Sequence, residues 1–159
     1  MQKASHNYKL LVIPIASPIL VGLYRDNELI KTISSDKKTS EILLNILMTF
    51  IDKYNISSII YTRGPGSYMA IKLTYIMLKT IEITRGIEVV GCSGFELNGA
   101  NPIKAIGNIY FIKEKETIIT KKYQQPVDLT FALPQRIDSL ILDKESIPLY
   151  VIPAVMSKF

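Results

Sequence analysis

The sequence is poor in the residue types that build disulfide or metal sites. It has one cysteine, Cys92, one histidine, His6, and no tryptophan. A disulfide framework and a His/Cys metal site within the chain are therefore excluded. The richest apolar run, 42–51, is broken by Asn45 and Thr49, so no stretch suits a helix that crosses a bilayer. No signal peptide is evident, and we expect a cytoplasmic protein without membrane contact.

Patterns typical of catalysis are also absent from the sequence. No histidine stands at a recognisable spacing from a serine or cysteine, and no pair of carboxylates lies in an apolar setting. Cys92 follows an apolar run and is typical of a core thiol. These patterns favour a binding protein over an enzyme. The net charge of +5 suits a protein that works near nucleic acid but does not require one.

Apolar periodicity is plentiful and predicts an α/β domain. Hydrophobic residues make up 48% of the chain, the usual globular share. Strands come first and then alternate with helices, so we expect a mixed sheet that is antiparallel at its start and parallel later. The predicted helices span 39–55, capped by Thr39 or Ser40, and 67–85, closed by Gly86. The predicted strands span 8–15, 19–25, 28–34, 56–62, 87–93, 103–113, 116–123, 137–143 and 148–153.

The stretch YTRGPGSYMA, residues 61–70, raises the question of a phosphate loop. Glycines in such loops let backbone N–H groups point into a concavity in front of a helix. The lysine of a P-loop is missing, and Met69 stands where a dinucleotide fingerprint needs its third glycine. We therefore interpret Gly64, Pro65 and Gly66 as a sharp corner and Ser67 as the cap of the second helix.

Both predicted helices carry more apolar surface than one-sided burial needs. Their polar residues fall on one stripe, and the apolar residues spread over an arc of roughly 240°, whereas a helix lying on a sheet needs only about 100°. The helices can cover some of the excess on each other, or the last third of the chain can drape over them. The alternative that we favour is a helical partner surface. Its candidate residues are Leu43, Leu47, Phe50, Ile51, Met69, Ala70, Leu73, Ile76 and Met77.

Segment 59–93 resembles the TsaB (YeaZ) family. The family motif R-G-P-G-S-[FY]-T-G-[LIV]-[RK] is matched by residues 63–68, with Lys72 at the basic position, and Gly86, Gly91 and Ser93 match the strand that follows. The resemblance is weaker over the rest of the chain. It implies an actin/Hsp70-type, ribonuclease-H-like fold with two long helices, with residues 1–100 as the first lobe and 101–159 as a reduced second lobe.

The resemblance also implies a function. TsaB-like proteins are inactive partners of TsaD, which transfers threonylcarbamoyl to the adenosine beside the anticodon of tRNAs reading A-starting codons. They bind TsaD through their first two helices and pair with themselves when it is absent. TsaE, an ATPase, joins the complex, so ATP is used through partner proteins. We expect no cofactor bound by this chain itself, and contact with tRNA only indirectly or weakly.

The chain departs from the family in the opening strand. Pro14 and Ile15 replace the Asp-Thr of that strand, and an acidic group there manages metal and phosphate in active relatives. We therefore expect no nucleotide binding by this chain alone. Two alternatives stay open: a small kinase-like or peptidase-like enzyme of the same fold, and a direct tRNA-binding module. The residues that motivate the second are Lys37, Lys38, Lys113, Lys115, Lys121 and Lys122.

Overall fold

A five-stranded mixed sheet forms the centre of the molecule in a computed structural model, which describes residues 5–128 and 130–151. The strand order is β3-β2-β1-β4-β5. The first three strands are antiparallel, whereas β4 pairs parallel with β1 and β5 parallel with β4. The predicted change from antiparallel to parallel pairing is thus confirmed. The strands are β1 (Tyr8–Ile13), β2 (Ile19–Arg25), β3 (Glu28–Ser35), β4 (Ile56–Gly64) and β5 (Glu88–Ser93).

The β2–β3 hairpin turns at Asp26 and Asn27. Their φ angles are 50° and 69°. Two consecutive left-handed residues suit the right-handed twist of a hairpin, and Asp and Asn tolerate this conformation better than most side chains. The Asp26 carboxylate also accepts hydrogen bonds from the Asn7 amide and pairs with His6. These bonds lower the pKa of Asp26.

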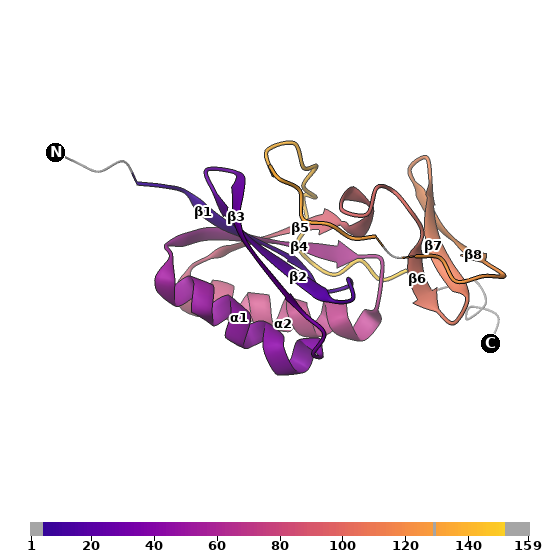
Figure 1. Cartoon of the computed structure of the whole chain (residues 1–159), viewed down its shortest axis with the longest axis horizontal. Coiled ribbons are helices and arrows are strands. Elements are labelled where there is room, and N and C mark those ends of the chain that lie inside the picture. Colours follow the sequence, from indigo (N-terminus) through magenta and orange to yellow (C-terminus); the bar gives the residue numbers. More distant parts are fainter. Residues whose placement is uncertain (1–4, 129, 152–159) are drawn as a thin grey trace.

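Two long helices cover one face of the sheet, as Figure 1 shows below the strands. They are α1 (Thr39–Lys53) and α2 (Tyr68–Arg85). Helix α1 begins after Lys38 without a side-chain cap, so the predicted cap at Thr39 or Ser40 is wrong. Helix α2 agrees with the prediction at both ends, because Ser67 accepts from the Ala70 amide and Gly86 is left-handed. The core between helices and sheet includes Leu10, Val12, Leu23, Leu43, Leu47, Phe50, Ile59, Tyr61, Ile71 and Leu78.

The opposite face of the sheet is covered by residues 130–151, here called the strap. The strap has no helix or strand of its own. Its apolar residues pack on the sheet beside Leu11, Ile60 and Cys92. Figure 1 shows it in orange and yellow, mostly on the side away from the helices. The predicted strands 137–143 and 148–151 are therefore wrong, and residues 152 and 153 lie outside the described residues. Within the last third of the chain, the strap packs mainly on the sheet, and it contacts the helices at the start of α2, where Tyr150 lies against Tyr68.

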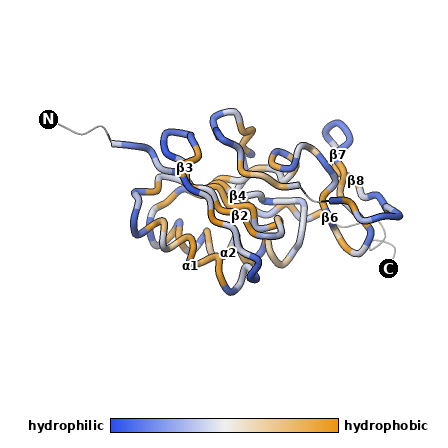
Figure 2. The backbone as a smooth tube through the Cα atoms, in the orientation of Figure 1, coloured by the Kyte–Doolittle hydropathy of each residue, from blue (hydrophilic) through white to orange (hydrophobic). Residues whose placement is uncertain are grey.

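The strap joins the two edge strands of the sheet. The Leu29 amide of β3 donates to Gln135 O over 2.9 Å, and the Asp143 amide donates to Gly91 O of β5 over 2.8 Å. Unpaired edge strands invite association with other chains, and these bonds occupy part of both edges. Figure 2 shows that hydrophobic residues gather along the central strands, whereas the projecting loops are hydrophilic.

A small antiparallel sheet lies between β5 and the strap in sequence. Its strands are β6 (Ile103–Ile106), β7 (Ile109–Glu114) and β8 (Thr117–Lys122), in that order. A turn containing Gly107, with a φ of 55°, divides the single strand predicted at 103–113 into two. The short helix η1 (Gly94–Glu96) leads into this sheet, and Phe95 packs against Ile103 and Phe111. The division of the chain at residue 100 stays a prediction.

Candidate partner-binding face and the Arg63 clamp

The corner between β4 and α2 is held by two close approaches. A Cβ on Gly64 would lie 2.5 Å from Leu149 O of the strap, and a Cβ on Gly66 would lie 2.6 Å from Ile15 Cγ2. Gly64 has a φ of 136° and Gly66 one of 157°, which side-chain-bearing residues rarely adopt. The corner therefore brings β1, β4 and the strap together at the point where α2 begins.

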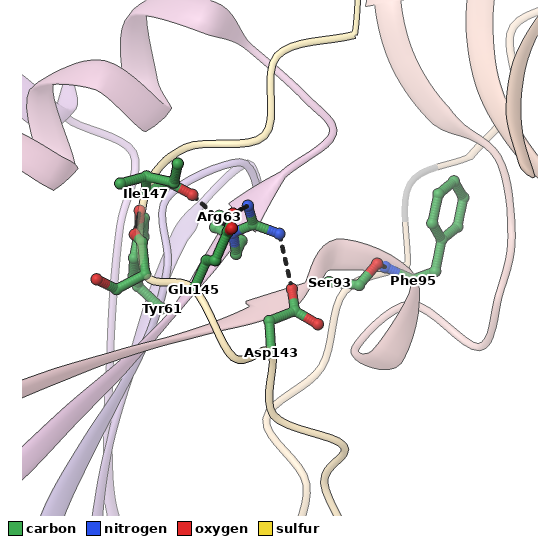
Figure 3. Close-up of polar contacts among 8 residues, drawn as sticks. Tyr61, Arg63, Ser93, Phe95, Asp143, Glu145 and Ile147 are labelled. Carbon is green, nitrogen blue, oxygen red and sulfur yellow. Dashed lines mark hydrogen bonds and ion pairs between the residues drawn. The ribbon is translucent and has the colours of Figure 1, made fainter. Parts of the chain in front are cut away.

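Arg63 clamps the strap beside this corner (Figure 3). Its Nε donates to Ile147 O over 2.6 Å, and its Nη1 donates to Asp143 Oδ2 over 3.0 Å. Glu145 lies 3.6 Å from the third nitrogen. The Arg63 side chain is only 11% exposed, so its charge is largely removed from water and these partners compensate for that cost.

Backbone bonds and a glycine complete the clamp. The Leu149 amide donates to Arg63 O over 2.8 Å, and the Tyr61 hydroxyl donates to Ser146 O. Burial raises the pKa of Tyr61, so this hydroxyl remains a donor. A Cβ on Gly91 would lie 2.5 Å from Arg63 Cδ, so the absent side chain makes room for the arginine. Arg63 of the predicted motif is thus a residue that holds the strap to the sheet.

The structure corrects part of the predicted interface. Leu43, Leu47 and Phe50 are at most 2% exposed and face the sheet, so their assignment to a partner surface is wrong. In the structure these three residues lie on the inner side of α1, whereas Leu44, which is 47% exposed, lies on its outer side. The predicted residues that are only half-buried are Ile51, Ala70, Leu73 and Met77.

Helix α2 keeps an exposed apolar row along its outer side. Met69 is 57% exposed, Ile76 51% and Ile83 81%. These residues are seven apart, and that spacing returns to the same side of a helix after two turns. Ile83 was not among the predicted interface residues, although its sevenfold spacing from Met69 and Ile76 is visible in the sequence. We call Met69, Ile76 and Ile83 the α2 row.

The strap extends the apolar surface at the start of α2. The Tyr150 ring lies 4.8 Å from the Tyr68 ring, and both residues remain about half exposed. Ile147 is 51% exposed on the same segment. The local sequence of the strap does not predict the contact of Tyr150 with Tyr68. The contact follows from the course of the strap, which Arg63 holds at Ile147.

Apolar side chains lie at the end of β1. Pro14 is buried at the end of β1, and Ile15 packs against the positions of Gly66 and Gly94. No group of three His, Cys, Asp or Glu residues that could hold a metal occurs among the described residues. Cys92 is fully buried, and burial raises the pKa of its thiol to about 12. The helices within the described part of the chain include none that is long and apolar enough to cross a membrane.

Comparisons with known proteins support the fold. No family model and no curated protein matches the sequence. An uncharacterized protein with similarity to peptidase YeaZ from Pseudomonas aeruginosa aligns with a TM-score of 0.56 at 12% identity, over 84% of this chain and 72% of the other. The fold is YeaZ-like. YeaZ from Pseudomonas aeruginosa aligns with a TM-score of 0.55 at 12% identity, over 80% of this chain and 71% of its own.

This similarity bears on the fold class predicted from the sequence. The chain has a mixed α/β architecture with a mixed sheet and two helices, and its fold is similar to that of YeaZ, in agreement with the actin/Hsp70-like fold that the resemblance implied. The YeaZ-like fold places β4, the glycine corner and α2 in the order that the resemblance implied.

Proposed function

We propose that this chain is a non-catalytic member of the TsaB family that binds a TsaD-like threonylcarbamoyl transferase. The transferase would form N6-threonylcarbamoyladenosine at adenosine 37 of tRNAs that read A-starting codons. The YeaZ-like fold and the TsaB-like motif at residues 63–68 support the family. The observation that carries the proposal is the exposed α2 row, which suits a helical partner.

The α2 row is large enough to contribute to binding. Full burial of an isoleucine or methionine side chain is favourable by about 1.5–3 kcal/mol relative to exposure. Met69, Ile76 and Ile83 are each at least half exposed, so covering the three would contribute on the order of 3 kcal/mol before the entropic cost of association. Tyr68 and Tyr150 enlarge the surface at one end, and aromatic residues are enriched in interfaces.

The same surface suits a second copy of the chain when the transferase is absent. Homodimers are usually two-fold, so the α2 row of one copy would face that of the other. Lys72 lies between Met69 and Ile76 on the exposed side and forms no ion pair with any residue that the structure describes. A two-fold axis near this lysine would bring two like charges together, which disfavours self-association relative to a partner that offers a carboxylate. A TsaE-like ATPase would join the heteromeric complex.

The test is co-purification with the TsaD-like protein of the same cell. Ile76→Glu places a charge in the α2 row, whereas Ile106→Glu places one on the small sheet. The two isoleucines are similarly exposed, at 51% and 53%, which makes Ile106→Glu a matched control. We expect Ile76→Glu to abolish the complex and Ile106→Glu to leave it intact, because a charge buried without a partner costs several kcal/mol.

Circular dichroism and thermal melting must show that both variants are folded. If folded Ile76→Glu still binds the transferase with the affinity of the original chain, the α2 row is not the partner surface. A purified chain that transfers phosphate from ATP or cleaves peptides by itself would instead support the enzyme alternative.

A further inference from the structure

The end of the strap lies beside the first two turns of α2. The Tyr150 ring lies 4.8 Å from the Tyr68 ring. Burial and the neighbouring Tyr68 raise the pKa of Tyr150, whereas Lys72 lowers it. Tyr75 adds to the rise of this pKa. Tyr150 therefore lies within electrostatic range of three residues that are spread over two turns of α2.

Arg63 fixes this end of the strap from behind. Its Nε donates to Ile147 O over 2.6 Å, and its own carbonyl accepts from the Leu149 amide over 2.8 Å. Both bonds come shortly before Tyr150 in the chain. The Arg63 side chain is only 11% exposed, so it acts on the outer surface through the strap. The Tyr150 ring stays beside α2 while these bonds hold the strap.

The strap end continues the α2 row. Tyr150 is 48% exposed and Ile147 is 51% exposed. Tyr68, which Tyr150 contacts, directly precedes Met69, the first residue of the row. Release of the strap would take two half-exposed side chains away from this surface and uncover the side of Tyr68 that Tyr150 covers. A partner that lies on the start of α2 would therefore meet a different surface in the docked and the released chain.

Lys72 indicates the charge of the partner. It is exposed, and its Nζ lies 5.7 Å from the centre of the Tyr68 ring. Lys79 pairs with Glu82 over 2.7 Å, whereas Lys72 forms no ion pair in the described part of the chain. Covering an unpaired ammonium is unfavourable unless the partner supplies a carboxylate. A helix that carries apolar side chains and an acidic residue therefore suits this surface better than a second copy, which would bring its own Lys72 to the same place.

We propose that partner binding at α2 requires the docked strap, and that Arg63 is the positioning residue that keeps the chain competent to bind. The inference rests on the proposed function and adds its regulation. The occupant is a helix of the TsaD-like partner that packs apolar side chains on the α2 row and on Tyr150 and places a carboxylate near Lys72. A partner that binds only the docked form loses affinity in proportion to the fraction of chains whose strap is released. By linkage, the bound partner stabilises the docked strap in turn.

The affinity of the purified TsaD-like protein of the same cell for the chain and its variants tests the surface. Tyr150→Ala removes the ring and should weaken binding at least about fivefold, whereas Tyr150→Phe keeps the ring and should keep the affinity within about twofold. Leu142→Ala is the matched control within the strap, because Leu142 is 45% exposed and lies opposite Cys92 at the edge of β5. The control should change the affinity by less than about twofold.

Hydrogen exchange tests the coupling between binding and docking. The Leu149 amide is protected while the strap is docked. In Arg63→Ala, a saturating amount of the partner should slow the exchange of this amide at least about tenfold. The partner should leave it unchanged in Arg63→Ala/Ile76→Glu, which cannot bind. Arg63→Lys should bind with an affinity between those of Arg63→Ala and the original chain, because lysine keeps the charge without the fork of donors.

Failure of this inference can be told apart from failure of the proposed function. If Ile76→Glu abolishes binding while Tyr150→Ala binds as tightly as Leu142→Ala, the partner uses α2 alone, so the inference is overturned and the proposed function stands. The same holds if the bound partner leaves the Leu149 amide of Arg63→Ala exchanging at its free rate. If Tyr150→Ala weakens self-association of the chain but not its affinity for the partner, the strap end serves a second copy and the inference is again overturned. If the original chain does not bind the TsaD-like protein, both proposals fail.

Discussion

Replacing Arg63 by alanine would release the strap from the sheet. The change removes the hydrogen bonds to Ile147 O at 2.6 Å and to Asp143 Oδ2 at 3.0 Å. Hydrogen bonds that involve a charged group contribute about 1.5–3 kcal/mol each. The Asp143 side chain is 32% exposed, so we take its hydrogen bond at the lower end of this range. The Glu145 side chain is 68% exposed, so its ion pair contributes little. We therefore expect the strap to lose about 2–4 kcal/mol of local stability.

Hydrogen exchange measures this loss where it occurs. The Asp143 amide donates to Gly91 O and the Leu149 amide to Arg63 O, so both are protected only while the strap is docked. A loss of about 2–4 kcal/mol should speed their exchange by about 30-fold to 1,000-fold. Arg63→Lys should fall between alanine and the original residue, because lysine keeps the charge without the planar fork of donors.

Arg136→Ala is the control for this experiment. Arg136 also lies in the strap, but its side chain is 53% exposed and pairs with Asp138 two residues away. Its removal should change the stability of the strap very little, because an exposed ion pair between near neighbours contributes little. If the Asp143 and Leu149 amides of Arg63→Ala exchange as slowly as those of Arg136→Ala, Arg63 does not hold the strap and the clamp is refuted.

Four further outcomes are expected. Gly66→Ala should lower the free energy of unfolding by about 1–3 kcal/mol, because of the backbone angle at this position and a clash with Ile15. Ile15→Ala removes the clashing side chain, so Gly66→Ala should cost less in a chain that also carries Ile15→Ala. If Gly66→Ala costs the same with and without Ile15→Ala, the clash is relieved elsewhere. Cys92, whose thiol pKa is raised to about 12, should react with a thiol reagent at pH 8 only when the strap opens, hence faster in Arg63→Ala; labelling that is equally fast in both chains would contradict this. Hydrogen bonds from Lys79 and from the Val89 amide lower the pKa of Glu82. Its contribution to the stability of the fold is therefore present above the ordinary pKa of 4.5 and is lost as the pH falls through the lower pKa of the folded state. Glu82→Gln should make stability fall less steeply at acid pH, and an unchanged acid dependence would argue against this. Calorimetry should show no magnesium-dependent ATP binding of micromolar affinity, and a stoichiometric signal would refute that expectation.

Local signals predicted one strand and both ends of α2 well. The sequence pattern located β2 at 19–25, the Ser67 cap and the left-handed Gly86, and the structure has all three. Each depends on neighbours within a few residues: alternation along a strand, a side chain that reaches a nearby amide, and a backbone angle that glycine adopts readily. Such features depend mainly on residues close together in the sequence.

The candidate interface could be predicted only in part. An apolar arc of roughly 240° shows that a helix has surplus apolar surface but not which part of the arc turns towards the sheet. Of the candidate residues, Met69 and Ile76 are exposed, whereas Leu43, Leu47 and Phe50 fill the core. The orientation of α1 is a property of its packing on β1 and β2, and that packing involves residues far away in the sequence.

The sequence by itself determined the order of strands and helices between residues 8 and 93, the mixed sheet, the glycine corner and the presence of surplus apolar surface on two helices. Tertiary structure decided the course of the strap, the role of Arg63 and the contact of Tyr150 with Tyr68. The physical reason is that the strap is held largely through backbone carbonyls and amides, such as Ile147 O and the Leu149 amide, which are alike in every residue type. Only the folded chain shows which of them meets Arg63.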